Sequence, residues 1–260
     1  MGLNKVKPHH IEHFYQPMWN LENWNIFGYE ALMRFKDPSI GNNIEKVFDV
    51  ARSEGYLFDM DTISITSAVK NFPLDSLKQE LLFINIYPST LLNDRFDAFL
   101  NELIKNYSIH PERIVFELNE TKEEEDIWES PLLKDKILAL KRYGFYVALD
   151  DIGKGVATLQ KIIEFEPNYI KLDRYFSVGL SESKTKQKLI SLFIEFSKHN
   201  MGLILEGIEK DVDLAQAKLI NVPIVQGYLL GKPQKVTQDN IYGQFRNFIA
   251  QQKEYQKLNH

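Results

Sequence analysis

Short apolar runs alternate with amphipathic stretches along most of the chain. Runs of about four to eight apolar residues predict buried strands, and apolar residues spaced three or four positions apart predict helices. The pattern predicts eight strands, at residues 11–18, 26–35, 81–86, 113–120, 145–149, 168–173, 203–209 and 222–230. It predicts helices at residues 44–51, 60–69, 92–103, 132–140, 159–163, 189–196, 211–219 and 237–257.

Capping residues refine some of these boundaries. The second helix is predicted to begin near Asp59 or Asp61, and Ser89 is expected to cap the third. Gly55 and Gly144 follow the first and fourth helices, where a glycine commonly ends a helix. Common helix-start and helix-end residues therefore agree with the predicted helix boundaries.

The first two strands are separated by only a short polar connection, at about residues 20–25. A parallel crossover needs a dozen or more residues, so these strands are predicted to form an antiparallel hairpin. The remaining strands alternate with helices, and no Ser/Gly-rich linker marks a second domain. The simplest closure is an α/β fold, a single TIM-like (β/α)8 barrel over residues 1–260 with its first strand antiparallel. An open doubly wound sheet is the alternative.

Composition limits the chemistry that this fold can carry. The 260 residues are 44% hydrophobic and 26% charged, which is typical of a soluble globular protein. No apolar run reaches the roughly 18 to 20 residues of a membrane helix, and we expect a cytoplasmic protein without membrane insertion. There is no cysteine, so a metal needs oxygen or imidazole ligands. A net charge of -5 gives no reason to expect extended nucleic-acid binding, but it allows a small phosphorylated ligand held through cations.

Nearly every predicted strand after the first carries an unusual polar residue late in its run. These residues are Glu30, Asn85, Glu117, Asp150 with Asp151, Lys171, Glu206 and Gln226. In a barrel the carboxyl ends of parallel strands converge on one rim, so these side chains are expected to meet. Hard oxygen ligands without cysteine favour Mg²⁺ or Mn²⁺, and two ions would balance this much negative charge better than one.

Each position also has a plainer interpretation. Asp150 and Asp151 alone could end a strand in a solvated turn, with Gly153 supplying a positive φ. The acidic run 123–126 is most simply solvated surface, and all six histidines lie outside the strand-end set and are not expected to be ligands. It is the joint occurrence at corresponding strand positions that favours one site.

Ordered motifs along the chain resemble a known family. Residues 29–34, Tyr-Glu-Ala-Leu-Met-Arg, are similar to the signature of the EAL domain family. Further matches occur at residues 15–17, at Asn85 with Pro88, and at residues 116–120, 150–153, 169–173, 206–209 and 226–229. The resemblance covers about residues 11–235. It implies a bacterial phosphodiesterase that opens the second messenger cyclic di-GMP to linear pGpG with Mg²⁺ or Mn²⁺, on a barrel whose first strand is antiparallel.

The resemblance also implies roles for individual residues. By this resemblance, the expected metal ligands are Glu30, Asn85, Glu117, Asp150 and Asp151. Its catalytic group comprises Lys171 beside the attacking water, Glu206 as general base or metal partner, and Glu120 and Glu209 as supporting acids. Its substrate-binding residues are Gln16, Leu32, Arg34, Gln226 and Pro233. In this family the loop after the aspartate pair is tied to dimerisation, which implies a homodimer.

Departures from the family pattern concentrate in that loop. They are Ile152, Lys154, Val156, Ala157 and Thr158, together with Asn119. These differences keep open a second hypothesis, a non-hydrolysing cyclic di-GMP receptor that acts through a regulatory protein partner. A third hypothesis, a sugar-handling barrel with Glu117 and Glu206 as paired acids, explains neither Asn85 nor the double aspartate.

Overall fold

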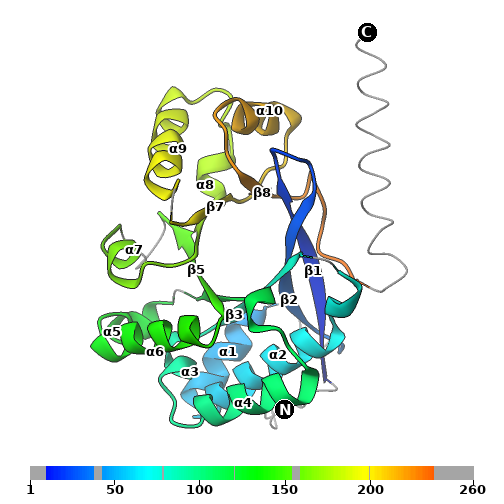
Figure 1. Ribbon diagram of the computed structural model, residues 1–260, viewed down its shortest axis with the longest axis vertical. Helices are drawn as coiled ribbons and strands as arrows, with labels where there is room; N and C mark the ends of the chain where they lie inside the picture. The colour runs from blue at the N-terminus through cyan, green and yellow to red at the C-terminus, as the bar shows by residue number, and fades with distance from the viewer. Residues whose placement is uncertain are drawn as a thin grey trace.

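The computed structural model of the chain describes residues 10–37, 43–77, 79–119, 121–153, 159–198 and 200–236. Within these residues the strands form a closed barrel in sequence order (Figure 1). The strands are β1 (Ile11–Asn20), β2 (Ile26–Phe35), β3 (Leu81–Ile86), β4 (Ile114–Leu118), β5 (Tyr146–Ile152), β6 (Tyr169–Leu172), β7 (Gly202–Leu205) and β8 (Ile224–Gln226). β8 pairs with β1, which closes the sheet and excludes the open doubly wound alternative.

The first strand is reversed relative to the rest, as the short connection predicts. β1 is antiparallel to both β2 and β8, and β2 pairs with β3 in parallel. The hairpin turns at Asn20, whose Oδ1 accepts the backbone N–H groups of Glu22 at 2.8 Å and Asn23 at 3.2 Å. The register of the hairpin places Gln16 opposite Glu30. The predicted barrel with an antiparallel first strand is thus confirmed.

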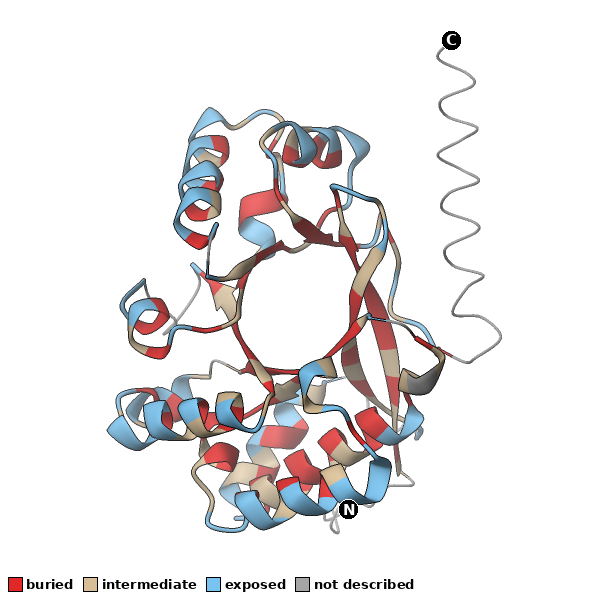
Figure 2. Cartoon of the chain, in the orientation of Figure 1, coloured by how far each residue is buried: buried red, intermediate tan, exposed pale blue. Residues whose placement is uncertain are grey.

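Helices surround the barrel, and their outward faces are exposed while the barrel wall is buried (Figure 2). The α-helices are α1 (Ile44–Ser53), α2 (Leu57–Asn71), α3 (Pro88–Leu91), α4 (Phe96–Tyr107), α5 (Glu125–Trp128), α6 (Pro131–Arg142), α7 (Leu159–Phe165), α8 (Arg174–Ser177), α9 (Lys184–Ser197) and α10 (Asp211–Leu219). Short 3-10 turns lie at η3 (Leu74–Ser76), η4 (Pro111–Arg113) and η5 (Lys122–Glu124). Because helices cover the parallel strands from outside, a strand such as β4 is buried along its whole length.

An apolar layer inside the barrel supports the rim where the polar strand residues lie. This layer contains Phe83, Val115, Ala148, Ile204 and Ile224, and Tyr169 packs against it. Side chains two positions apart on a strand point to the same face. The residues two positions further along these strands are Asn85, Glu117, Asp150, Glu206, Gln226 and Lys171. The polar group therefore forms the next layer of the barrel interior, directly above apolar side chains.

Several predicted boundaries were wrong. α2 begins at Leu57, and its N-cap Tyr56 makes no side-chain capping bond, so neither Asp59 nor Asp61 caps it. Ser89 lies inside α3, whose N-cap is Tyr87, and the N-cap of α4 is Arg95, so Ser89 caps neither helix. The strand predicted at residues 203–209 ends at Leu205, because Gly207 turns the chain with a φ of 72°.

Other differences concern burial and extent. Glu124, in the acidic run interpreted as solvated surface, is 1% exposed. Asp150 and Asp151 lie within β5 rather than after it. The helix predicted at residues 237–257 lies outside the described residues. No helix in the described part of the chain has the length and apolar character needed to cross a bilayer.

Candidate active site

The polar residues predicted on separate strands meet around the ammonium group of Lys171. Lys171 Nζ lies 2.7 Å from Glu206 Oε1, 2.8 Å from Glu117 Oε1, 3.1 Å from Asp150 Oδ1 and 3.7 Å from Glu30 Oε2. The lysine is 1% exposed, so its charge is buried below the rim. The expected convergence of these strand ends is therefore a feature of the structure.

Negative charge exceeds positive charge at this rim. Four carboxylates face one ammonium group, and Asp151 adds a fifth carboxylate beside Asp150 and Glu206. Neither oxygen of Glu117 has a hydrogen-bond partner of good geometry, although Lys171 Nζ lies 2.8 Å from Oε1. Buried, incompletely satisfied carboxylates are costly unless cations neutralise them. The donor set therefore fits divalent cations with oxygen ligands.

Burial and neighbouring charges have opposing effects on the pKa values of Glu117, Glu206 and Lys171. Burial raises the pKa of Glu117 well above its ordinary value, and the nearby Lys171 ammonium only partly opposes this. Burial also raises the pKa of Glu206. For Lys171, burial lowers the pKa, but Asp150, Glu117 and Glu206 together outweigh it and hold the pKa well above its ordinary value. Lys171 therefore stays charged and acts as a hydrogen-bond donor.

The aspartate pair has an unusual backbone. Asp151 has a φ of 52°, in the left-handed region that few residues other than glycine adopt, and its N–H donates to Asp150 Oδ1 at 2.9 Å. Such conformations cluster at functional sites. Oxygen atoms of Asp150, Asp151 and Glu206 all lie within 4.8 Å of one another, so this group could hold a metal ion. Gly153 follows with a φ of 101°, and a Cβ there would lie 2.5 Å from the Phe176 ring.

Glu30 is held by a neighbour across the barrel. Gln226 Nε2 donates to Glu30 Oε2 at 2.7 Å, so the amide orients the carboxylate from β8. Gln16 lies opposite Glu30 in the hairpin register, and its Nε2 donates to the carbonyl of Gly231 at 3.1 Å. These contacts bring Gln16 and Gln226 to the same rim as the predicted metal ligands.

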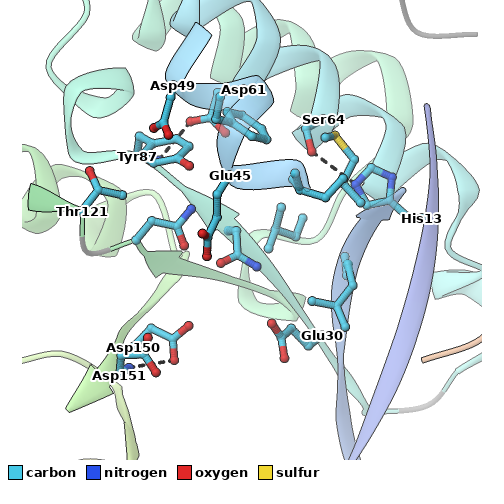
Figure 3. A pocket seen from close by; sticks show the side chains of 18 of the residues that line it. His13, Glu30, Glu45, Asp49, Asp61, Ser64, Tyr87, Thr121, Asp150 and Asp151 are labelled. Carbon is cyan, nitrogen blue, oxygen red and sulfur yellow. Dashed lines mark hydrogen bonds between the residues drawn. The ribbon is translucent and has the colours of Figure 1, made fainter. Parts of the chain in front are cut away.

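Two cavities open on this rim and share Glu30 and Asp150 in their walls. The larger, of about 540 Å³, is lined by Leu32, Arg34 and Asn85 among others. Its walls also include Asp151, Glu45 of α1 and Asp61 of α2 (Figure 3). The smaller, of about 250 Å³, is lined by Gln16, Lys171, Glu206, Glu209 and Gln226. The acidic group thus contributes to the walls of both cavities.

Not every predicted residue joins the group around Lys171. Glu209 lines the smaller cavity but is paired with Arg174 at 2.8 Å. Arg34 donates to the carbonyl of Met33 at 2.7 Å, and Pro233 lines neither cavity. Glu120 lies outside the described residues, as do the departures at residues 154–158.

Three buried polar groups near the larger cavity were not predicted. His13 Nε2 lies 3.2 Å from Ser64 Oγ, and its Nδ1 lies 3.3 Å from Ser67 Oγ. Asp61 and Glu124 are the other two, and both are almost fully buried. An aspartate among the apolar positions of the 60–69 helix was the available signal for Asp61, whereas nothing in the acidic run distinguishes Glu124 from its neighbours.

The class defined by fold and site is a closed barrel with one reversed strand and an acidic rim around a buried lysine, and the oxygen atoms of that rim could hold divalent cations. The EAL domain family matches residues 4–233. The chain belongs to the EAL domain family.

Relatives of the chain include proteins named for cyclic di-GMP. Cyclic di-GMP phosphodiesterase RocR from Pseudomonas aeruginosa is 25% identical over 236 residues, which cover 86% of this chain and 57% of RocR. The chain thus spans little more than half the length of RocR. The c-di-GMP-bound structure of a standalone versatile EAL protein from Vibrio cholerae O395 is 26% identical, with a TM-score of 0.71 over 86% of this chain and 92% of that one.

A further structure bears on the fold alone. Klebsiella pneumoniae BlrP1, solved as a manganese and cy-diGMP complex, has a TM-score of 0.75 to this chain at 22% identity. The match covers 90% of this chain and 58% of that one. The barrel architecture is therefore shared with a protein that was crystallised with both a metal and the dinucleotide.

Proposed function

We propose that this chain hydrolyses cyclic di-GMP to linear pGpG with the help of Mg²⁺ or Mn²⁺. The observation that carries the proposal is the gathering of four carboxylates around Lys171, with a fifth, Asp151, beside Asp150 and Glu206, in the walls of two cavities. Membership of the EAL domain family and the likeness to RocR support it. Because the proposed ligand is a bacterial second messenger, we propose that the chain acts in the cytoplasm.

The proposed cation ligands are the residues whose oxygen atoms face the rim. They are Glu30, Asn85, Glu117, Asp150 and Asp151, with Glu206 beside them. Two ions would compensate the charge better than one, since a single ammonium group faces the carboxylates. When bound, such cations lower the pKa of a water molecule and neutralise phosphate oxygens.

Glu206 is proposed to accept the proton of the attacking water. Its carboxylate lies 2.7 Å from Lys171 Nζ, which orients it and, being charged, can donate to the water or to a phosphate oxygen. The water oxygen bonds to phosphorus as the P–O3′ bond breaks. The departing 3′ oxygen takes up a proton from solvent, and Glu206 later returns the proton of the attacking water to solvent. The product is the linear dinucleotide with a 5′ phosphate.

We propose that a dinucleotide spans the two cavities, which share Glu30 and Asp150 in their walls. One phosphodiester at Glu30 and Asp150 would leave one half of the ligand in each cavity, with Leu32 and Arg34 on one side and Gln16 on the other. Arg34 can fork onto a phosphate oxygen, because its guanidinium carries several donors. Gln226 is proposed to act through Glu30, and Glu209 to act at the outer rim.

We further propose that the chain forms a homodimer and receives its input from a regulatory protein in trans. Exposed apolar side chains on α9 support a protein interface, since Leu189, Leu192 and Phe196 are 40%, 67% and 50% exposed. Light scattering at several concentrations measures the oligomeric state, and a monomer throughout would reject the dimer.

One experiment tests the hydrolase. Purified chain is incubated with cyclic di-GMP and Mg²⁺ or Mn²⁺, and the nucleotides are separated by chromatography. Formation of pGpG that stops on addition of EDTA supports the proposal. Tight binding without product supports the receptor hypothesis, and no binding rejects both.

A further inference from the structure

Two buried carboxylates outside the acidic rim hold the turn that follows Asn85. Asp61 on α2 is 2% exposed, and its Oδ2 accepts the backbone N–H of Tyr87 at 3.0 Å (Figure 3). Glu124 on η5 is 1% exposed, and its Oε2 accepts the backbone N–H of Ser89 at 2.8 Å. Its Oε1 accepts the Ser89 hydroxyl at 2.5 Å. The first residues after β3 are thus fixed from two sides.

The peptide group between Ile86 and Tyr87 is held at both ends. Its N–H donates to Asp61, and its carbonyl accepts the backbone N–H of Asn119 at 3.0 Å. This planar group begins one residue after Asn85, which pairs with Glu117 in the register of β3 and β4. Fixing this plane restricts the backbone at Ile86 and so the path of the chain at the end of β3, next to Asn85.

Arg52 joins this turn to α1. Its Nη2 atom lies 3.5 Å from Glu124 Oε1, and its guanidinium carbon lies 5.0 Å from the centre of the Tyr87 ring. The same arginine pairs with Asp49 at 3.1 Å. Elements from three parts of the chain therefore meet at the turn: α1, α2 and the loop after β4.

Burying a carboxylate to hold a turn costs free energy, because the charged group is desolvated. A buried carboxylate loses its hydration, and here Asp61 accepts the Tyr87 N–H, while Glu124 accepts the N–H and hydroxyl of Ser89 and lies beside the Arg52 guanidinium. We propose that Asp61 and Glu124 are positioning residues: by fixing the turn after β3 they hold Asn85 towards the acidic rim and raise the affinity of that rim for divalent cations. This inference rests on the proposed function only in that Asn85 binds a cation.

The test measures Mn²⁺ binding without nucleotide. Titration calorimetry is carried out on the unsubstituted chain, on Asp61→Leu and on Glu124→Ala. Asp59→Leu is the matched control, because Asp59 lies on the same helix and forms an exposed pair with Arg95 at 2.9 Å. Ile137→Val is the control for stability, because Ile137 is fully buried in α6 and lines neither cavity.

Both test variants are expected to weaken Mn²⁺ binding about 10-fold to 100-fold, the usual effect of removing a group that orients a metal ligand. Asp61→Asn keeps an acceptor oxygen for Tyr87 and is expected to restore most of the affinity. Asp59→Leu and Ile137→Val are expected to bind as the unsubstituted chain does, even where Ile137→Val melts at a lower temperature.

Unchanged affinity in Asp61→Leu and Glu124→Ala overturns the proposal, and so does an equal loss in Ile137→Val. If Asp61→Leu does not fold, Glu124→Ala decides the matter. An unsubstituted chain that binds Mn²⁺ but does not cleave cyclic di-GMP refutes the proposed hydrolase, while the comparison of variants still decides this inference. An unsubstituted chain that binds no Mn²⁺ overturns the inference.

Discussion

Lys171 Nζ and Glu206 Oε1 lie 2.7 Å apart at the centre of the acidic rim. The same ammonium group lies within 3.1 Å of Glu117 and Asp150, so one buried cation serves several carboxylates. A bound divalent ion would help to neutralise these carboxylates, because it supplies positive charge to the same oxygen atoms. Stability and cation binding should therefore be coupled at this rim.

Substituting Lys171 by methionine removes the ammonium group and leaves its carboxylate neighbours buried. We expect the free energy of unfolding in EDTA to fall by about 3 to 5 kcal/mol, the usual cost of breaking a buried ion pair. Urea unfolding measures this loss. Adding Mn²⁺ is expected to recover more stability in Lys171→Met than in the unsubstituted chain, because cations then provide the missing charge.

Lys136→Met is the control for this experiment. Lys136 pairs with Asp97 at 2.9 Å at the protein surface, where an ion pair contributes at most about 1 kcal/mol. Equal losses in the two variants would contradict the central role of Lys171.

Glu206→Gln keeps the size of the side chain but removes the proposed proton acceptor. We expect kcat for cyclic di-GMP to fall about 10²-fold to 10⁴-fold, the range typical of a lost general base. The dissociation constant of cyclic di-GMP, measured with Ca²⁺ or by rapid mixing, should change much less. Glu195→Gln, on the exposed face of α9, is the control. A Glu206→Gln enzyme that turns over at the parent rate contradicts the assignment of the base.

Glu30→Ala removes a proposed cation ligand. We expect it to abolish turnover and to lower the number of Mn²⁺ ions bound per chain, as measured by titration. Gln226→Leu leaves the Glu30 carboxylate in place and removes the 2.7 Å hydrogen bond that orients it. It should therefore weaken Mn²⁺ binding about 10-fold without abolishing it. Glu102→Ala, an exposed position on α4, serves as the control. Full turnover by Glu30→Ala argues against the ligand set.

The residues that line the rim were predictable because strand geometry places them. Asn85, Glu117 and Glu206 each follow an interior apolar residue by two positions, and the carboxyl ends of parallel strands share one rim. Alternation along a strand is local, so it can be read without knowing the fold. Closure of the barrel followed from the count of strands and from the short connection after β1.

Asp61 and Glu124 were not predictable in the same way. Their partners are backbone groups 26 and 35 positions away, and those groups approach only when α2 and the loop after β4 pack against the end of β3. A charged residue on a helix or in an acidic run is usually solvated. The local pattern therefore predicts exposed side chains at Asp61 and Glu124, which are buried in the structure. The burial of His13 between Ser64 and Ser67 was likewise not predictable, because it depends on the contact of β1 with α2.

His13 provides a test of stability against pH. Burial, with a smaller contribution from the charge of Arg34, lowers the pKa of His13 from 6.5 to about 4. The unfolded chain therefore binds more protons at this histidine than the folded chain does between these pH values. The contribution of His13 to stability is complete above about pH 6.5 and is lost as the pH falls towards 4, by roughly 3 kcal/mol in total.

The measurement is urea unfolding in EDTA at several pH values between 4 and 7, on the unsubstituted chain and on His13→Gln. Other groups titrate in this range, so the informative quantity is the difference in unfolding free energy between the two proteins. We expect this difference to increase with pH up to about 6.5 and then to level off. His110→Gln is the matched control, since His110 is exposed and lies 3.6 Å from Glu112. A difference that does not change with pH would show that His13 titrates alike in the folded and unfolded chain.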